Sequence, residues 1–125
     1  MIATLSDVRV KQITVYNRQV ACTTCDSRAF VWGVCDEAFG MDWKVHTPTE
    51  MTKWGRVAHV ERGNRFALVL DLEGQLFGYG ANGEGQLGLG DTTTRSKLTK
   101  IDAFVNKEII KFECGRYAAV VLTTA

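Results

Sequence analysis

Four side chains in the first half of the chain have the types and part of the spacing of a zinc site. They are the pair Cys22-x-x-Cys25, followed by Cys35 and His46. The internal repeat described below places Cys22 at the end of a strand, Cys25 in the turn after it and Cys35 in the next loop. We therefore interpret the cysteines as buried or incidental thiols and expect no metal and no cofactor. Stoichiometric zinc in the purified protein would contradict this.

A second pattern, Gly78-x-Gly80-x-x-Gly83, has the spacing of a dinucleotide-binding fingerprint. That chemistry requires a helix to begin after the third glycine, because the helix N-terminus holds the pyrophosphate. Each glycine in a helix costs about 1 kcal/mol relative to alanine. Three more glycines follow, at Gly85, Gly88 and Gly90. The segment is therefore predicted to be a loop of tight turns and not a nucleotide site.

The histidines and carboxylates give no catalytic constellation. His46 and His59 are the two histidines, and neither has a serine or carboxylate neighbour at a spacing that indicates a proton relay. The carboxylates of one stretch cluster at turns, where they bond backbone amides: Asp71, Glu73, Glu84 and Asp91. We expect the protein not to be an enzyme, with guanine-nucleotide exchange as the one activity left open.

Basic and aromatic side chains are the candidates for partner contacts. A mildly basic stretch is interpreted first as a solvated rim, with contacts to phosphates or an acidic partner as the alternative. Its members are Arg95, Lys97, Lys100, Lys107 and Lys111. Three aromatic residues in predicted loops, Trp43, Trp54 and Phe104, are either interface anchors or packing between repeats. Possible partner contacts are thus Trp43, Trp54, Arg95, Lys97 and Phe104.

Composition restricts the class of protein. With 125 residues, the chain is one domain by size or part of a larger one. Lys and Arg number 15 against 14 Asp and Glu, so charge gives no case for nucleic acid or a membrane surface. No apolar run approaches the ~20 residues of a membrane span, and residues 1–17 lack the apolar core of a secretory signal. Four cysteines without a disulfide framework favour a reducing compartment, cytoplasm or nucleus.

The elements that would position these residues come from an internal repeat. Shifting the sequence by 47 positions places Val10 on Val57 and Phe30 on Phe77, and a shift of 52 places Gly63 on Gly115. The units are roughly 10–56, 57–108 and 109–125. Apolar, β-rich runs separated by glycine turns predict short antiparallel strands, and the continuous apolar run 66–70 predicts a strand covered on both faces. Residues 92–100 and 102–107 are predicted to be surface loops.

The repeat resembles that of the regulator of chromosome condensation family. The stretch LDLEGQLFGYGANGEGQLGLGD at 70–91 has its strand, acidic-glycine turn, second strand and N-x-x-G-Q-L-G-x-G-D loop. Unit one keeps Trp32-Gly33 but has lost the Gln-Leu pair. The positions that match the repeat motif are Gly33, Gly74, Gly80, Asn82, Gly85, Gln86, Leu87, Gly88, Gly90, Asp91 and Gly115.

The resemblance implies an all-β fold of antiparallel four-stranded β-propeller blades. A seven-bladed ring of ~50-residue repeats needs about 350 residues, so this chain holds about two blades and part of a third. It implies a protein–protein interaction scaffold that belongs to a larger propeller or complex, with propeller-completing chains as partners. The alternatives are a guanine-nucleotide exchange factor for a small GTPase and a structural subunit of a large assembly.

Overall fold

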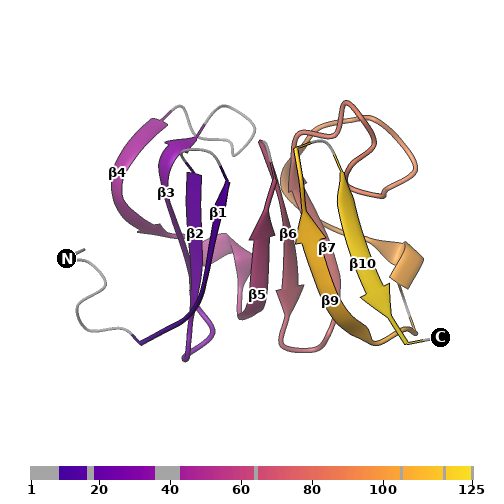
Figure 1. Ribbon diagram of the computed structural model, residues 1–125, viewed down its shortest axis with the longest axis horizontal. Helices are drawn as coiled ribbons and strands as arrows, with labels where there is room; N and C mark the ends of the chain where they lie inside the picture. The colour runs from indigo at the N-terminus through magenta and orange to yellow at the C-terminus, as the bar shows by residue number, and fades with distance from the viewer. Residues whose placement is uncertain are drawn as a thin grey trace.

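The computed structural model describes residues 9–16, 19–35, 43–63, 65–104, 106–116 and 118–124. They form three antiparallel sheets that stand side by side (Figure 1). The first sheet, blade one, has the order β1-β2-β3-β4 and the second, blade two, the order β5-β6-β7-β8. The third sheet pairs β9 with β10. The predicted all-β fold of antiparallel four-stranded blades is confirmed.

Each sheet is built from short strands joined by tight turns. Blade one consists of β1 (Val10–Tyr16), β2 (Gln19–Thr24), β3 (Ala29–Cys35) and β4 (Trp43–Glu50). Blade two consists of β5 (Val57–Arg62), β6 (Phe66–Asp71), β7 (Leu76–Gly80) and β8 (Arg95–Lys100). The third sheet consists of β9 (Ile109–Cys114) and β10 (Ala119–Thr123). Two 3₁₀ helices, η3 (Thr52–Trp54) and η4 (Asp102–Phe104), connect one sheet to the next.

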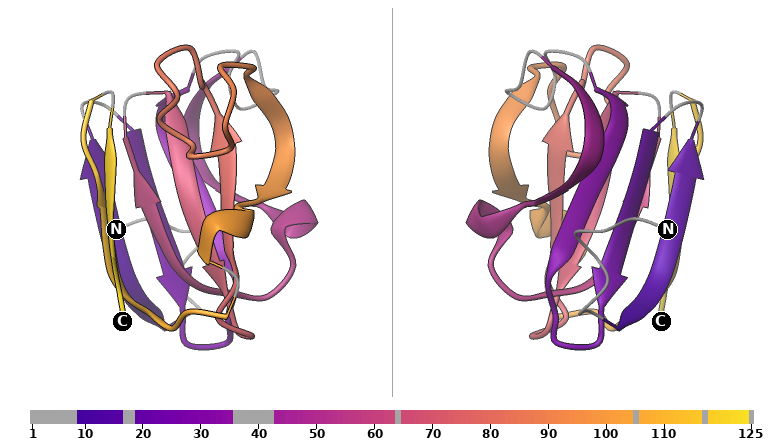
Figure 2. Two further views of the ribbon diagram at one scale, coloured as in Figure 1. Left: turned by 90° about the vertical axis from the view of Figure 1, so that its right-hand side faces the viewer. Right: turned by 90° about the vertical axis from the view of Figure 1, so that its left-hand side faces the viewer.

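The sheets stack face to face with their first strands closest together. Strand β5 lies against β1 and β2 of blade one and against β9 of the third sheet. Figure 2 shows the sheets from the side, with β1 and β9 at one edge of the molecule and β4 and β8 at the other. This radial arrangement, in which inner strands converge and outer strands diverge, is typical of consecutive propeller blades.

Strand β6 supplies both hydrophobic cores because its side chains alternate between the two faces of blade two. Ala67 and Val69 pack in the core shared with blade one, and Phe66 and Leu68 in the core shared with the third sheet. A strand with an apolar neighbour on each face needs apolar residues at every position. The predicted two-sided burial of 66–70 is confirmed.

A β-bulge recurs at one place in each sheet. The pairing of the first and second strands skips one residue: Lys11 in β1, Ala58 in β5 and Ile110 in β9. Apart from the bulge the register repeats, with Ile13 opposite Cys22, Val60 opposite Val69 and Phe112 opposite Val121. These pairs define which positions are equivalent in the three sheets.

Two predicted loops are wrong. Residues 95–100 form β8 and not a loop, and Trp43, which was also predicted to lie in a loop, begins β4, the strand that contains His46. Both are the last strands of their sheets and pair with one neighbour only. Such strands can be polar throughout, and β4 can contain Pro48, since one edge needs no partner and one face reaches solvent. The third repeat unit, predicted to begin at residue 109, opens with a strand there, β9.

Candidate functional site

The loop between β7 and β8 is organised around Asn82, whose side chain is completely buried. Its Nδ2 atom donates to the backbone oxygens of Asp91 and Thr93, both at 3.1 Å, and to Asp91 Oδ1 at 3.0 Å. Its Oδ1 atom accepts from the backbone N–H of Leu87 at 3.0 Å. One amide therefore ties the beginning, middle and end of the loop together, because it has donors and an acceptor at fixed angles.

Leu87 folds the middle of this loop back onto blade two. It is buried in the core that contains Ile101 and Phe112. A Cβ on Gly78 would lie 3.2 Å from the Leu87 side chain, so glycine leaves room for this contact. Gln86 Oε1 accepts from the Glu84 backbone N–H at 2.9 Å. The Gln-Leu pair thus closes the loop: one side chain bonds its backbone and the other anchors it.

The loop contains turns and no helix over 81–94, as its glycines predicted. Gly80 ends β7 with φ +102°, and a Cβ there would lie 2.5 Å from the Arg65 carbonyl oxygen. Only glycine fits this close approach of two backbones. The other motif glycines with positive φ are Gly74, Gly85, Gly88 and Gly90. Gly33 lies within β3, where it pairs with Val45.

Asp91 and Arg95 close the end of the loop. Arg95 Nη2 donates to Asp91 Oδ2 at 2.7 Å, and the Thr93 backbone N–H donates to Asp91 Oδ1 at 3.0 Å. The hydrogen bond from Arg95, followed by that from Thr93, lowers the pKa of Asp91 below its ordinary value. Arg95, a predicted partner contact, therefore already binds within its own loop, whereas Lys97 is exposed on β8.

A second glycine pair marks the contact between blade two and the third sheet. A Cβ on Gly63 would lie 2.4 Å from the Gly115 carbonyl oxygen and 2.2 Å from the Phe66 ring. The equivalent Cβ on Gly115 would meet only the Ala118 oxygen, at 3.7 Å. Gly63 is thus required where the third sheet packs against blade two, whereas no further sheet is described beside Gly115.

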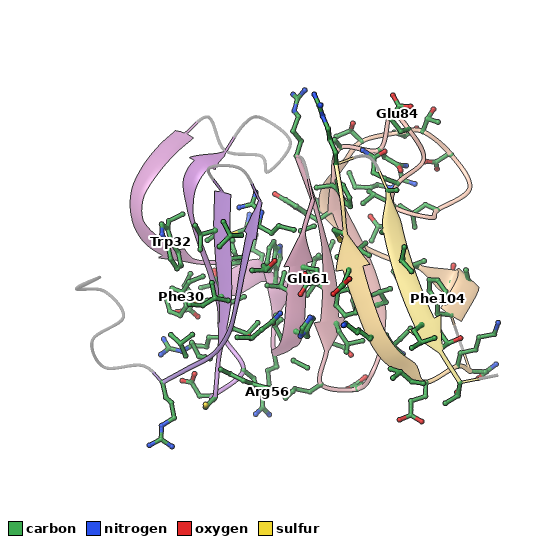
Figure 3. The ribbon with its side chains drawn as sticks, in the orientation of Figure 1. Phe30, Trp32, Arg56, Glu61, Glu84 and Phe104 are labelled. Carbon is green, nitrogen blue, oxygen red and sulfur yellow. The ribbon has the colours of Figure 1, made fainter. Side chains whose placement is uncertain are left out.

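The three aromatic residues predicted to contact a partner lie in different environments. Trp54 is 6% exposed in the core between blades one and two, with its ring edge-on to Tyr79 at 5.7 Å between centroids. It is packing between blades and not an interface anchor. Phe104, on η4, is half-buried beside a cavity (Figure 3). Trp43 begins β4, and its side chain lies outside the described residues.

A polar cluster that was not expected from the sequence lies where the first strands of the sheets meet. Gln12 Nε2 donates to Glu61 Oε2 at 2.9 Å and lies 3.0 Å from His59 Nε2, which is itself 2.9 Å from Glu61 Oε2. Thr14 Oγ1 donates to Glu61 Oε1, and the His59 ring meets Phe112 edge-on at 4.8 Å. Figure 3 shows Glu61 at this junction. The cluster links blade one to blade two and places His59 against the third sheet.

Two simple signals would have found this cluster. Residues two apart on a strand share a face, so His59 has a carboxylate neighbour, Glu61, and the prediction that it has none is wrong. Gln12 and His59 are 47 positions apart, the shift of the internal repeat, so equivalent positions touch across blades.

The thiols lie in three environments. Cys22 is buried and Cys25 exposed, and Cys114 lies between blade two and the third sheet. Burial, with the nearby Glu61 charge, raises the pKa of Cys114 to about 12, and burial also raises the pKa of Cys22. Over the ranges that the structure describes, no three His, Cys, Asp or Glu side chains are grouped to hold a metal. The backbone of Cys35 and His46 is described, but their side chains are not.

The two outermost sheet faces carry exposed apolar side chains. Ile13 on β1 is 60% exposed, whereas Val60, its equivalent in β5, is fully buried against blade one. On the other side of the molecule, Val120 on β10 is 72% exposed, whereas the equivalent Leu68 in β6 is 1% exposed. The outer face of blade one is therefore equivalent to the face of blade two that packs on blade one. The outer face of the third sheet is equivalent to the face of blade two that packs on the third sheet.

The fold and these faces define an incomplete β-propeller, a ring architecture of which the described residues form a sector. Within that class, residues 73–122 match the model of the family described as "Regulator of chromosome condensation (RCC1) repeat". That segment is an RCC1 repeat, and the resemblance found in the sequence is confirmed.

Comparison with known proteins agrees with this assignment. The chain is 27% identical to human E3 ubiquitin-protein ligase HERC2 over 121 residues, which cover 91% of the chain and 2% of HERC2. It is 30% identical to human HERC4, a probable E3 ubiquitin-protein ligase, over 98% of the chain and 12% of HERC4. The chain thus spans a small part of these relatives, and their ligase activity belongs to much longer proteins.

Among solved structures, the fold matches Prp20p from Saccharomyces cerevisiae with a TM-score of 0.83 and 17% identity. The match covers 95% of this chain and 32% of Prp20p, which is described with its binding properties to Gsp1p and histones. At this identity the likeness establishes the fold alone. Within the described ranges, no helix has the length and apolar character needed to span a membrane.

Proposed function

We propose that the chain is a protein–protein interaction scaffold made of RCC1-type blades, that its two outer faces are covered by further blades of the same kind, and that it carries out no chemistry of its own. The further blades belong to the same polypeptide or to other chains. The observation that supports this is the exposure of Ile13 and Val120 at positions whose equivalents, Val60 and Leu68, are buried between blades.

Leaving these two apolar faces in water costs free energy. Burial of apolar surface contributes about 25 cal/mol per Å², and a contiguous apolar face indicates a contact surface. Ile13 and Val15 form one such face, and Val120 and Leu122 the other. Because the two faces correspond to opposite sides of one blade, they favour head-to-tail contacts, which close a ring when the rotation allows.

Solution mass, measured by light scattering or native mass spectrometry, tests this proposal. We expect the purified chain to associate with itself or with a co-purifying partner, and the double variant Val120→Asp with Leu122→Asp to remain monomeric. Leu72→Asp is the matched control, because Leu72 is an exposed apolar residue in a turn outside both faces. A stable, folded wild-type monomer at all concentrations would contradict the proposal.

A second candidate is guanine-nucleotide exchange on a small GTPase, which the family resemblance implies. Prp20p, which shares this fold, is described with its binding to Gsp1p and histones, so blades of this kind occur in a protein that binds other proteins. Exchange requires only a binding face that displaces the nucleotide, so it needs no catalytic triad. A nucleotide-release assay against a panel of small GTPases tests it. Absence of acceleration at micromolar protein would exclude it.

A third candidate is a structural subunit of a large assembly, favoured by the small share of HERC2 and HERC4 that the chain spans. In all three cases we propose an intracellular, reducing compartment. The free thiols of Cys22, Cys25 and Cys114 support it. Co-purification followed by identification of the bound proteins separates a structural subunit from a scaffold for signalling proteins.

A further inference from the structure

A cavity of about 290 Å³ opens where the β6–β7 turn meets η4, away from both outer faces. Figure 1 shows this turn at the end of the molecule opposite the 81–94 loop. Blade two and its connection to β9 supply the whole lining: Glu73, Gly74, Gln75, Leu76, Lys100, Ile101, Phe104, Asn106 and Lys107. Its apolar floor is Leu76 and Ile101, both buried, with the half-buried Phe104 beside them.

The equivalent place in blade one is filled by the protein itself. Phe30 pairs with Glu50 and Phe77 pairs with Lys100, so Glu50 and Lys100 occupy equivalent positions. In blade one, Arg28 Nε lies 2.9 Å from Asp26 Oδ2, and Arg28 Nη1 lies 3.2 Å from Glu50 Oε1. One guanidinium thus bridges two carboxylates across the turn and the last strand.

Blade two has lost this clamp and reversed part of its charge. Gln75 stands in the place of Arg28, and Lys100 in the place of Glu50. Lys107 joins the cavity from the connection to β9. Neither Lys100 nor Lys107 makes an ion pair with any residue that the structure describes. The cavity therefore contains two ammonium groups, Lys100 in the place of Glu50 and Lys107 from the connection, and keeps one carboxylate, Glu73, in the place of Asp26.

Size and charge restrict the ligand. Pockets for small-molecule ligands range from about 300 to 1,000 Å³, so this cavity accommodates one or two side chains and not a nucleotide. Glu73 on the rim opposes a second negative charge on the ligand, which disfavours a phosphate dianion relative to a carboxylate. The ring of Phe104 adds a surface for an apolar neighbour.

We propose that this cavity binds an acidic side chain of a peptide segment in a partner protein. The carboxylate bridges Lys100 and Lys107, with charges inverted relative to the Arg28 clamp, and an adjacent apolar side chain packs on Phe104. The inference goes beyond the scaffold proposal, because no outer-face residue lines the cavity.

The test is a titration of the full chain, followed by backbone amide NMR shifts, with a blocked tetrapeptide of alanine, glutamate, leucine and alanine. We expect shifts centred on Gly74, Ile101 and Asn106 that saturate by about 10 mM, as a Kd near 1 mM requires. The same peptide with glutamine for glutamate, and inorganic phosphate, should bind at least about tenfold more weakly. No shift at these amides, or equal or tighter binding of either control, would overturn the proposal.

Protein variants separate the cavity from general charge. Lys107→Gln should weaken binding about tenfold, whereas Lys97→Gln, on the same strand as Lys100 but outside the cavity, should not change it. Gln75→Arg combined with Lys100→Glu rebuilds the blade-one clamp beside Glu73 and should abolish binding without lowering Tm. Retained binding in this double variant would refute the inference. None of these results depends on the solution mass, so failure here and failure of the scaffold proposal are distinguishable.

Discussion

Blade one and blade two have the same strand order, the same bulge and equivalent turns, but different residues form the turn between their second and third strands. In blade two, Asp71 Oδ1 accepts from the backbone N–H groups of Glu73 and Gln75, and Gly74 takes φ +85°. In blade one, Thr24 Oγ1 accepts from the Arg28 backbone N–H, and Ser27 takes φ +68°. The backbone path is therefore set by pairing and packing, and the motif residues lower its cost.

The two blades differ most in their faces. Both faces of blade two are covered, whereas blade one exposes the face that contains Ile13. A close backbone approach or a buried amide is costly to alter only where a neighbour covers it. Substitutions at equivalent places should therefore have large effects in blade two and small ones at the edges of the molecule.

The largest effect is expected for Gly80→Ala. The new Cβ would lie 2.5 Å from the Arg65 oxygen and 2.9 Å from Phe66 Cα, at a φ that L-residues avoid. We expect a loss of about 3 kcal/mol or more in the free energy of unfolding. Gly83→Ala, with open space and no positive φ, is the control and should lie within about 0.5 kcal/mol of wild type. Chemical denaturation measures both, and similar losses would contradict the geometry.

Asn82→Ala should be next. It removes three donated bonds and one accepted bond and leaves the Leu87 N–H without its partner inside the loop. Each buried unsatisfied group costs about 1–3 kcal/mol, so we expect a loss of about 3 kcal/mol. Gln86→Ala, which removes one bond in an exposed part of the loop, should cost about 1 kcal/mol or less. Equal losses for the two variants would show that Asn82 does not organise the loop.

Gly63→Ala and Gly115→Ala compare a covered position with its uncovered equivalent. Gly63→Ala pushes a methyl group against the Gly115 oxygen and the Phe66 ring, and we expect a loss of about 2 kcal/mol. Gly115→Ala should be close to neutral in the free chain, because its Cβ makes only an ordinary contact. If a further blade packs there in a complex, the same substitution should weaken that complex. The measurements are Tm of the chain and the affinity of the assembled species.

Exchanging the serine and glycine of the two equivalent turns should change the free energy of unfolding by smaller amounts than the substitutions above, and in opposite directions. Ser27→Gly relieves a positive φ in blade one and should stabilise the chain by about 0.5–1 kcal/mol, whereas Gly74→Ser should destabilise it by about 1 kcal/mol. No Cβ contact complicates Gly74. Thermal unfolding of both variants checks the sign, and a destabilising Ser27→Gly would mean that the serine side chain holds the turn.

Thiol labelling involves no substitution and is expected to have the smallest effect on stability. The labelling rate of each cysteine measures how readily its side chain becomes accessible to the reagent. Cys25 should react first with a maleimide or disulfide reagent, because it is exposed. Cys114 should react slowly at pH 8, since a pKa of about 12 leaves almost no thiolate and its side chain, on β9, packs against blade two. Raising the pH towards 12 should speed its reaction. Peptide mapping assigns the labelled cysteines, and rapid labelling of Cys114 at pH 8 would contradict its partly buried position and its raised pKa.

Much of the architecture could be predicted from the sequence because the repeats align with one another when the sequence is shifted along itself. The shift of 47 placed Phe30 on Phe77, and these residues occupy equivalent positions in β3 and β7. The last strand of each blade could not be predicted, since β4 and β8 pair on one edge only and consist mostly of polar residues. Trp54 was ambiguous between partner contact and core for a similar reason: a 3₁₀ helix of three residues has no periodicity that indicates which side is buried.

The candidate sites were harder to predict. Phe104 and the lysines of the basic stretch were recognised as candidates, but nothing in their spacing joined Lys100 and Lys107 to Phe104. The cluster of Gln12, His59 and Glu61 was missed because each of its members is ordinary alone. Contacts between residues 47 positions apart require the stacking of one blade on the next.

The amino-acid sequence by itself determined the repeat, its strands and the glycine loop, because alternation, turn chemistry and positive φ are local properties of neighbouring residues. The tertiary structure alone decided which faces are covered, that Arg95 binds its own loop, and that the Arg28 clamp of blade one is replaced by a cavity in blade two. These depend on distances between residues far apart in the chain, which are fixed only when the sheets pack.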